Sequence, residues 1–357
     1  MISISLCMIV KNEEEVLEKC LDSVRDIADE IIIVDTGSTD NTKEIARKFT
    51  DKIYDFKWID DFAAARNYSY SKATKEYIMW LDADDYFKEE DREKLLHLKK
   101  TLKNSVKSVM FKYHYSSDKD GNPTLTFMRE RLSKRAENYR WVEPIHEYLD
   151  TNGHEMLTDI AVTHNRPDKN DSDRNLRIFE KNIADDKQLS ARGTYYYARE
   201  LYNHGRYDEA KTQFEKFLDE RQGWYEDNIN ACHLLASCYA FEEDWFKALQ
   251  SAMRSFVYDV PRGELCCDIG NIYQKNKDYE KALFWYKIAA GLDLPKGTIG
   301  FVNSDSYNYT PLLEACVCLD KLGRKKEAAE YNERAAAFKP ESKAVKQNRE
   351  YFESLKE

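Results

Sequence analysis

The sequence lacks three features that would each assign it to a class of protein. Its 8 cysteines are scattered and show no Cys-x-x-Cys or Cys/His spacing, so we expect buried, reduced thiols and no cysteine-based metal site. No apolar stretch is long enough to span a membrane, and the apolar opening at residues 2–10 has no cationic stretch before it. An excess of positive charge is also missing, because the formal net charge is -10. This charge argues against general nucleic-acid binding and against a polybasic membrane anchor.

These absences, together with a mean hydropathy of -0.75, predict a cytoplasmic protein that does not insert into membranes. The length of 357 residues fits two domains, each with enough apolar content for its own core. A polar segment at 165–173 contains the helix-breaking Pro167 and ends in an N-cap candidate, so we place the boundary near Pro167. We predict a first domain at residues 1–166, a linker with a connecting helix (174–189) at 167–190, and a second domain at 191–357.

The first ninety residues alternate between strand and helix patterns. Apolar, β-rich runs at 3–10, 30–34 and 78–81 predict strands, and the apolar spacing over 13–24 predicts a helix. Asp40 or Asn41 can cap a further helix that runs to Phe49. Such a succession predicts an α/β domain with a parallel sheet, whose ligands lie outside the carboxyl ends of the strands.

Carboxylates follow the strand that ends at Leu81. Because side chains on a strand alternate between its faces, Asp82 and Asp84 are expected to emerge on the same side, where they would suit a hard divalent cation held against a diphosphate. Asp is also a common turn former just past a strand, which is the plainer interpretation of the motif taken alone. Asp85, next to this pair, is as well suited to a helix cap or a turn as to the site.

Four segments occur together in a specific order. They are Ile-Ser-Leu-Cys-Met-Ile-Val-Lys-Asn-Glu-Glu (4–14), Val-Asp-Thr-Gly-Ser-Thr-Asp-Asn-Thr (34–42), Ala-Arg-Asn (65–67) and Leu-Asp-Ala-Asp (81–84). In this combination the sequence resembles the family-2 glycosyltransferases of the GT-A fold. It is also similar to the sublancin-type subgroup, which joins this domain to tetratricopeptide repeats and includes an enzyme that modifies a peptide. The matching His-Glu segment of that subgroup is Trp-Val-Glu-Pro-Ile-His-Glu (141–147).

The resemblance implies a nucleotide-sugar donor, expected to be a UDP-sugar, and a divalent cation, Mn²⁺ or Mg²⁺, between which the oxygen ligands do not discriminate. It makes Asp84 the direct metal ligand and places Asp82 near the ribose and the ion. Arg66 is expected to fork onto phosphate oxygens or onto a carboxylate such as Asp35, unless it forms only a surface ion pair. The donor-binding residues implied in full are Val10, Asn12, Glu13, Asp35, Ser38, Arg66, Asn67, Asp82, Ala83 and Asp84.

The catalytic base is sought in the segment 141–147. Family-2 enzymes generally invert the anomeric carbon in one displacement, which requires a base for the acceptor's proton. The resemblance favours Glu147 or His146 over Glu143, although the geometry can reverse this order. The plainer interpretation of Glu147 is an exposed carboxylate at a helix start. His164, which follows a strand-like stretch, is a further metal-ligand candidate or a structural histidine.

The second half of the sequence repeats. Alanines at 210, 248, 282 and 328 lie 38, 34 and 46 residues apart, close to the roughly 34-residue tetratricopeptide period. Small residues about twelve positions before each alanine mark the close approach of paired helices: Ala198, Ala236, Gly270 and Cys316. We therefore predict an all-α tetratricopeptide-like solenoid. Such stacks present an extended concave face for peptides, and they can dimerise through their end faces.

Taken together, the sequence predicts an α/β GT-A domain with a Rossmann-like, mostly parallel sheet, followed by the solenoid. The expected function is inverting, metal-dependent transfer from a UDP-sugar to a protein or peptide side chain presented along the repeats. One alternative is transfer to a surface glycan or lipid-linked saccharide. The other is a non-catalytic nucleotide-sugar-binding adaptor, against which the intact Asp82, Asp84 and Glu147 argue. Sugar choice is expected to depend on residues 106–132, where Tyr113, His114 and Tyr115 line the donor pocket or pack the sheet.

Overall fold

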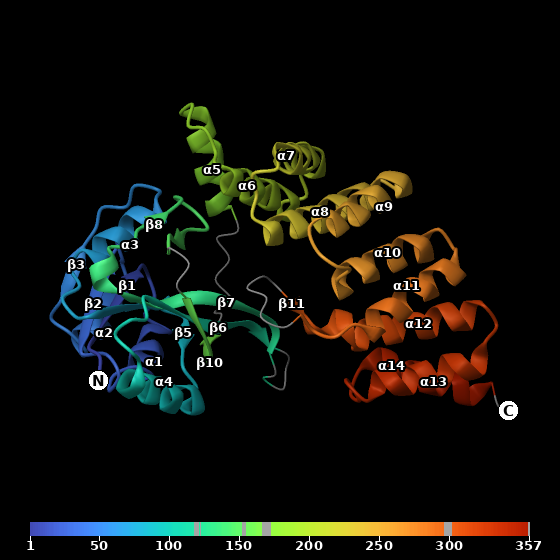
Figure 1. The fold of residues 1–357 in the computed structure, drawn as a ribbon, viewed down its shortest axis with the longest axis horizontal. Coiled ribbons are helices and arrows are strands. Elements are labelled where there is room, and N and C mark those ends of the chain that lie inside the picture. Colours follow the sequence, from blue (N-terminus) through green and yellow to red (C-terminus); the bar gives the residue numbers. More distant parts are fainter. Residues whose placement is uncertain (118–120, 122, 152–154, 166–172, 296–301, 356–357) are drawn as a thin grey trace. The chain divides into compact units, whose positions relative to one another are not determined.

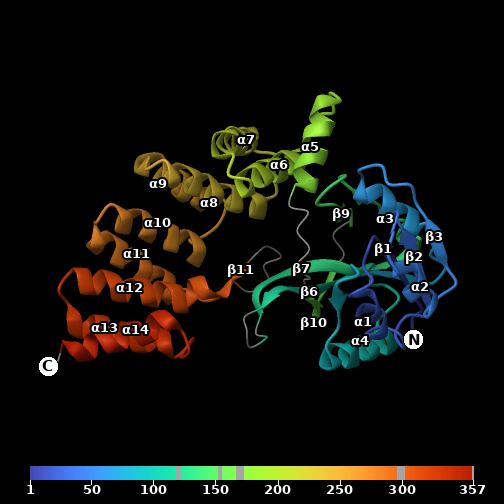
Figure 2. The same ribbon diagram turned by 180° about the vertical axis from the view of Figure 1, so that it is seen from behind.

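The computed structural model describes residues 1–117, 121, 123–151, 155–165, 173–295 and 302–355. The chain divides into two units, Met1–Ile178 and Phe179–Glu357 (Figures 1 and 2). The boundary that the sequence suggests at Pro167 lies outside the described residues. The division falls within helix α5 (Arg174–Ala184), which stops five residues before the expected Leu189.

The N-terminal unit begins with alternating strands and helices and ends with longer strands. Its elements are β1 (Ile4–Val10), α1 (Leu17–Asp22), β2 (Glu30–Asp35), α2 (Thr42–Arg47), β3 (Ile53–Asp55), α3 (Phe62–Tyr70), β4 (Tyr77–Trp80), β5 (Asp85–Tyr86), α4 (Glu89–Thr101), β6 (Ser108–Ser117), β7 (Pro123–Lys134), β8 (Trp141–Val142), β9 (Tyr148–Leu149) and β10 (Glu155–His164). A short 3-10 helix, Arg135–Glu137, follows β7.

The main sheet has the strand order β3-β2-β1-β4-β7-β6-β10-β5. The strands β3, β2, β1 and β4 are mutually parallel, as predicted, whereas β7 is antiparallel to both β4 and β6. The sheet is therefore mixed. In the parallel part, Val10 pairs with Asp35 and Cys7 pairs with Trp80, so the carboxyl ends of β1, β2 and β4 meet at one edge.

Helices cover both faces of this sheet, and the alternation of β1 explains why. Leu6 and Met8 point into a core that also contains Leu17 and Leu21 of α1 and Leu95 of α4. Cys7, between them, joins a cluster on the opposite face, where α3 packs. Figure 1 shows α1 and α4 on one side of the strands and α3 on the other. Burial on both faces fits the continuous apolar runs of β1 and β2.

The first helix is shorter than its apolar periodicity predicts. The predicted helix spans 13–24, but α1 begins only at Leu17, although the apolar positions Val16 and Val24 are buried as expected. The backbone N–H of Glu13 donates to Thr42 Oγ1 at 2.7 Å, and the Glu13 carbonyl closes a turn onto Val16 at 3.2 Å. This cross-link holds residues 13–16 as turns. It fixes the loop after β1, which contributes to the site described below.

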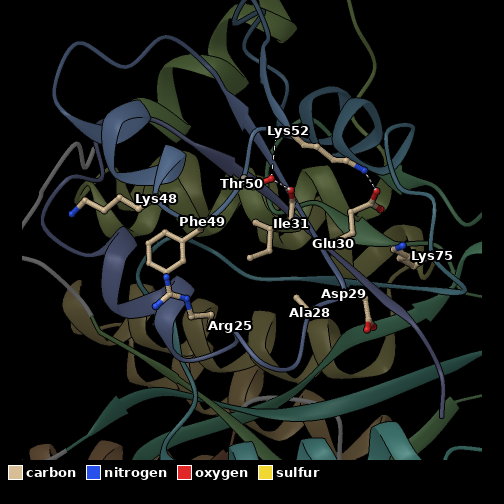
Figure 3. A pocket seen from close by; sticks show the side chains of 10 residues that line it. All are labelled: Arg25, Ala28, Asp29, Glu30, Ile31, Lys48, Phe49, Thr50, Lys52 and Lys75. Atoms are coloured by element: carbon tan, nitrogen blue, oxygen red, sulfur yellow. Dashed lines mark hydrogen bonds and ion pairs between the residues drawn. The ribbon is translucent and has the colours of Figure 1, made fainter.

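A pocket of about 330 Å³ lies at the opposite edge of the sheet, near the amino ends of β2, β3 and β4. Figure 3 shows its lining, which includes Arg25, Glu30, Lys52 and Lys75. The Glu30 carboxylate is 2% exposed and accepts hydrogen bonds from Lys52 and Ser5, and from Thr74 N and Oγ1 at 2.9 Å. The cations around this pocket are thus partly neutralised from within the unit.

Glu30 should make stability depend on pH in the acid range. Burial alone would raise its pKa, but the hydrogen bonds from Lys52, Ser5 and Thr74 outweigh burial and lower the pKa to about 2. Because this pKa lies below the unfolded value, the contribution is complete above about pH 4.5 and disappears as the pH falls toward 2. Chemical unfolding at several pH values should show Glu30→Gln less stable by about 2 kcal/mol at pH 7. The difference in unfolding free energy between the wild type and Glu30→Gln should shrink steadily below pH 4.5. A difference that stayed constant with pH would contradict this assignment.

The C-terminal unit consists of helices arranged in successive antiparallel pairs (Figure 2). Its elements are α6 (Ala191–Asn203), α7 (Tyr207–Glu220), α8 (Tyr225–Phe241), α9 (Trp245–Arg254), α10 (Gly263–Lys275), α11 (Tyr279–Gly291), α12 (Tyr309–Lys321), α13 (Lys325–Ala336) and α14 (Lys343–Ser354), with 3-10 turns at Ser255–Val257 and Ser304–Tyr307 and a short strand β11 (Val302–Asn303). The predicted alanines are fully buried, one in each second helix of a pair: Ala210, Ala248, Ala282 and Ala328. The predicted hairpin repeat is confirmed.

Close approach of paired helices is visible at Gly270 of α10. A Cβ placed there would lie 2.7 Å from the ring of Tyr286, which belongs to α11. The Tyr286 hydroxyl in turn donates to Gln274 Oε1 at 2.8 Å. All eight cysteines are free thiols, and each except Cys267 is buried. Among the described residues, no helix has the length and apolar character needed to cross a membrane.

Candidate active site

The loops that follow β1 and β2 are tied to each other at the carboxyl edge of the sheet. Asn12, whose φ is 56°, accepts a hydrogen bond from the backbone N–H of Thr39 at 2.8 Å, and its own N–H donates to Ser38 Oγ at 3.0 Å. Asp35 lies between these loops and is 1% exposed. The sequence-predicted donor residues Asn12, Asp35 and Ser38 are therefore neighbours. Val10, at the end of β1, accepts the N–H of Thr36 at 2.9 Å.

The Asp35 carboxylate caps the turn that follows its own strand. It accepts the backbone N–H groups of Gly37 at 3.1 Å and Ser38 at 3.0 Å, and Lys43 Nζ lies 3.6 Å away. The sequence predicts phosphate oxygens or a carboxylate such as Asp35 as the partner of Arg66. In the structure Arg66 binds two carboxylates, and neither is Asp35.

Arg66 of α3 joins Asp82 to Glu147. Its Nη2 donates to Asp82 Oδ1 at 2.7 Å, and its Nε donates to Glu147 Oε1 at 2.6 Å. Arg66 is 5% exposed, and its guanidinium lies over the rings of Trp80 and Trp141, with centroid distances of 4.6 and 4.8 Å. Charge-assisted bonds in such a sheltered position are strong and directional. This pairing excludes the weak surface ion pair considered from the sequence.

The carboxylates after β4 are placed by a turn and not by strand alternation. The strand ends at Trp80, and the Asp85 N–H closes a turn onto the Asp82 carbonyl at 3.1 Å, with the predicted residue Ala83 buried inside it. Asp82 points to Arg66, whereas Asp84 points to His164. Strand hydrogen bonding ends at Trp80, so a turn sets these different partners, and a shared role of Asp82 and Asp84 in binding a cation stays a prediction.

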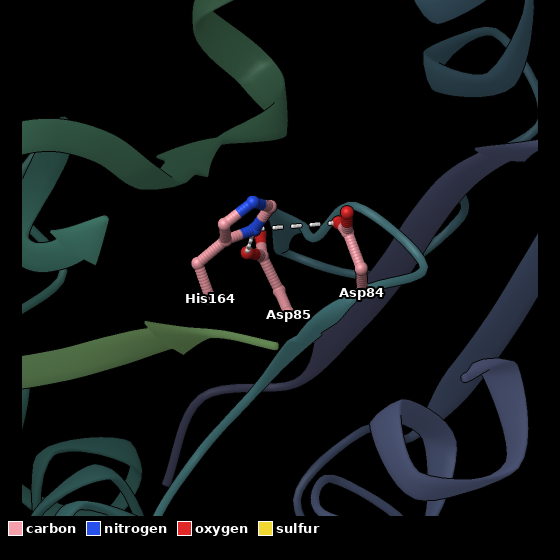
Figure 4. Close-up of side chains that lie close together, drawn as sticks. All are labelled: Asp84, Asp85 and His164. Carbon is pink, nitrogen blue, oxygen red and sulfur yellow. Dashed lines mark ion pairs between the residues drawn. The ribbon is translucent and has the colours of Figure 1, made fainter. Parts of the chain in front are cut away.

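Asp84, Asp85 and His164 form the cluster drawn in Figure 4. One ligand atom from each lies within 4.8 Å of the others, and His164 Nδ1 is 3.6 Å from Asp84 Oδ1 and 3.7 Å from Asp85 Oδ1. The two carboxylates are suitable ligands for Mn²⁺ and Mg²⁺, and the imidazole is a common ligand of transition metals. Asp85 takes the place in this cluster that the sequence assigned to Asp82.

The electrostatics of this cluster fit a cation. Burial, followed by the charges of Asp82 and Asp85, raises the pKa of Asp84 to about 6, with His164 acting in the opposite direction. The Oδ1 atom of Asp85 is buried and has no hydrogen-bond partner in the described part of the chain. An added positive ion would relieve both the repulsion and the unsatisfied oxygen.

The loop between β8 and β9 carries the candidate bases in an unusual backbone conformation. Glu143 and His146 have φ values of 74° and 53°, which L-residues rarely adopt without compensation from their surroundings. Glu147 precedes β9 and its side chain is 12% exposed. It is therefore not the exposed helix-start carboxylate that the plainer interpretation expected. Of the candidates Glu143, His146 and Glu147, only Glu147 is joined to Asp82 through Arg66 in the described structure.

Asn67, next to Arg66, anchors β8. Its Nδ2 donates to the Trp141 carbonyl at 2.9 Å, and its Oδ1 accepts the Trp141 N–H at 3.0 Å. Both ends of the amide are thus used by one backbone residue. Asn67 holds Trp141 against Arg66, and a direct donor contact stays a prediction for Asn67, as it does for Glu13.

Sequence reasoning missed Arg131, which is 0% exposed and ion-paired with Asp85 at 2.9 Å. In the pairing of β6 with β7, Val109 faces Leu132 and Met110 faces Glu130, so Arg131 is an extra residue opposite neither partner. Bulges of this kind redirect a side chain and are common beside active sites. The spacing of Arg129 and Arg131, two positions apart in β7, was the one signal in the sequence.

The residues expected to influence sugar choice divide between the two faces of β6. The Tyr113 hydroxyl is 3.0 Å from His164 Nδ1, and the Tyr115 ring stacks on His164 with a centroid distance of 5.1 Å. His114, between them, instead bonds Thr126 Oγ1 at 2.9 Å. Tyr113 and Tyr115 are therefore beside the Asp84–Asp85–His164 cluster, and His114 is not.

Comparison with known proteins relates the N-terminal unit to a protein family. A family model described as glycosyl transferase family 2 matches residues 5–153. A TPR repeat-containing protein of Synechococcus elongatus is 37% identical over 153 residues, which are 42% of this chain and 36% of the relative. The SPbeta prophage-derived glycosyltransferase SunS of Bacillus subtilis is 27% identical over 245 residues, 61% of this chain and 56% of the relative. The chain thus spans between 36% and 56% of the length of these curated relatives.

Among solved structures, YrrB, a TPR protein with an unusual peptide-binding site, matches with 17% identity and a TM-score of 0.38, over 50% of this chain and 83% of its own. The hairpin assignment comes from the helix pairs and their buried alanines and does not depend on this likeness. Within the N-terminal unit, residues 5–153 thus match glycosyl transferase family 2, and this unit is joined to tetratricopeptide-like helical hairpins.

Proposed function

We propose that the protein transfers a sugar from a nucleotide-sugar, expected to be a UDP-sugar, to a protein or peptide side chain, with inversion and with a divalent cation. The observation that carries the proposal is the double pairing of Arg66, which holds Asp82 and Glu147 at 2.7 and 2.6 Å. One residue of the predicted donor side and one candidate base thereby share a single buried guanidinium. A nucleotide-binding adaptor would have no need for the second pairing.

The chain's own residues account for the acceptor half of the reaction. An acceptor hydroxyl or thiol attacks the anomeric carbon, its proton passes to Glu147, and the bond from that carbon to the donor phosphate breaks. Arg66 fixes the orientation of Glu147 during this transfer, and the indoles of Trp80 and Trp141 shield that ion pair from water. The nucleoside diphosphate leaves with the bonding electron pair.

Asp84, Asp85 and His164 would hold the cation, because their ligand atoms lie within 4.8 Å of one another. When bound, a divalent cation supplies Lewis-acid stabilisation of the negative charge that develops on the leaving diphosphate. Arg131 holds Asp85 in place through its ion pair at 2.9 Å. The tied loops that contain Asn12, Asp35 and Ser38 would receive the nucleoside.

The helical unit supports a protein or peptide acceptor. Stacked helix pairs form a long surface to which extended peptides commonly bind. This part of the proposal rests on architecture and on the family resemblance.

The test is donor hydrolysis, in which water replaces the unidentified acceptor. We expect the full chain with Mn²⁺ to release nucleoside diphosphate from at least one of UDP-glucose, UDP-N-acetylglucosamine, UDP-galactose and GDP-mannose, and to stop when a chelator removes the metal. Restoring Mn²⁺ or Mg²⁺ should restore the rate, which controls for damage by the chelator. Absence of hydrolysis with every donor, together with absence of heat on titration of UDP and Mn²⁺, would overturn the enzyme assignment.

A further inference from the structure

Trp80 lies at the centre of a group of arginines. Among the described residues, Arg66, Arg131 and Arg129 place their guanidinium carbons 4.6, 3.9 and 5.2 Å from the centroid of the Trp80 ring. The indole Nε1 donates to the carbonyl of Glu130, which fixes the ring against β7. The ring therefore aligns cations from α3 and β7 beside the turn that carries Asp82 and Asp84.

These arginines differ in how their charge is compensated. Arg66 binds the carboxylates of Asp82 and Glu147, and Arg131 is paired with Asp85. Arg129 has no carboxylate within ion-pair distance in the described part of the chain. Its closest recorded polar contact is the backbone oxygen of Glu147, 3.4 Å from Nη2. A half-buried guanidinium with so little compensation is ready to bind an anion.

The charge of Asp84, two residues after Asp82, has little compensation. Asp84 has His164 as its nearby cationic group, at 3.6 Å, and that charge exists only when the imidazole is protonated. The described site thus combines an acidic group at Asp84 with a basic group at Arg129, while Asp82 is paired with Arg66. A divalent cation bound to a diphosphate has the complementary distribution of charge.

We propose that Arg129 binds the diphosphate of the nucleotide donor, together with a cation held by the Asp84–Asp85–His164 cluster. This inference rests on the proposed function. The planar guanidinium can contact two phosphate oxygens at once, which a lysine cannot do. A carboxylate of the sugar or of an acidic acceptor is the competing occupant, and the experiment below separates it from the diphosphate.

The test compares binding of UDP and of uridine, each with Mn²⁺, by isothermal titration of the full chain. For Arg129→Gln we expect UDP affinity to fall by about tenfold to a hundredfold, whereas uridine affinity stays at the wild-type value. Arg129→Lys should fall between the two, because it keeps the charge and loses the fork. Arg135→Gln is the matched control, because Arg135 is exposed just past the C-terminal end of β7. This variant should bind UDP as tightly as the wild type does.

Three results would overturn the inference. If Arg129→Gln bound UDP as tightly as the wild type, a phosphate contact would be excluded, and the carboxylate would remain as the occupant. An equal loss of UDP and uridine affinity would show that Arg129 acts on the structure of the site, and thermal unfolding of the variant would reveal the same. Absence of UDP and GDP binding to the wild type would overturn the proposed function and this inference with it.

Discussion

Replacement of Asp84 by asparagine is expected to lower donor hydrolysis by about a thousandfold, without loss of stability. The asparagine keeps the size of the side chain but removes the carboxylate that points at His164. Because the charges of Asp82 and Asp85 repel that of Asp84, the unfolding midpoint of the metal-free variant should equal or exceed that of the wild type. Rates of nucleoside diphosphate release and thermal unfolding of the same preparations measure both effects.

Asp159→Asn provides the control for this prediction. Asp159 is a carboxylate of β10 whose side chain is 71% exposed and pairs with Lys94 on the surface. Its variant should hydrolyse the donor at the wild-type rate. Mn²⁺ titrated without nucleotide should give heat with the wild type and with Asp159→Asn, and little with Asp84→Asn. An Asp84→Asn protein that kept more than about a tenth of the wild-type rate would contradict the assigned metal site.

Glu147→Gln should reduce donor hydrolysis by a factor of about a hundred to ten thousand and leave UDP binding unchanged. Glutamine fills the same space and its oxygen can still accept from Arg66 Nε, but it cannot take the proton of the attacking group. Glu143→Gln and His146→Gln are the matched variants from the same loop, and both should retain most of the activity. Initial rates and UDP titrations of all three variants distinguish loss of the base from loss of the donor site.

The opposite pattern would reassign the base. If Glu143→Gln or His146→Gln were inactive and Glu147→Gln active, Arg66 would serve to hold Asp82 and Glu147 as structural partners only. If Glu147→Gln lost both UDP binding and activity, the Arg66 network would support the donor loop.

The sequence was informative wherever a strand or helix pattern alone decides which residues meet. Parallel strands bring their carboxyl ends to one edge, so Asn12, Asp35 and Asp82 could be predicted to follow strands that end at the same edge of the sheet. The hairpin repeat was equally predictable, since Ala210 and its counterparts occupy positions where only a small side chain allows two helices to pack.

Partner choice within the site could not be predicted in this way. Asp85, and not Asp82, joins Asp84 and His164, because the strand ends at Trp80 and a turn then sets the direction of each carboxylate. Arg131 reaches Asp85 because a register shift in β7 leaves it without a cross-strand partner. Both outcomes depend on hydrogen-bond geometry over one or two residues, to which apolar periodicity is insensitive. Of the partners that the sequence left open for Arg66, a carboxylate was right in kind, but the structure selects Asp82 and Glu147 in place of Asp35.

The pairing of Arg66 with both Asp82 and Glu147 has a kinetic consequence. A single guanidinium restrains two carboxylates that belong to loops far apart in the chain, so neither loop can shift without altering the hydrogen bond made to the other. If the arriving nucleotide draws Asp82 aside, the restraint on Glu147 changes at the same moment, and by reciprocity an engaged Glu147 alters the grip on the nucleotide. Binding of the nucleotide would then affect the base, and engagement of the base would affect the binding of the nucleotide. This coupling gives a structural basis for ordered binding of the two substrates and for protection of the donor from hydrolysis by water.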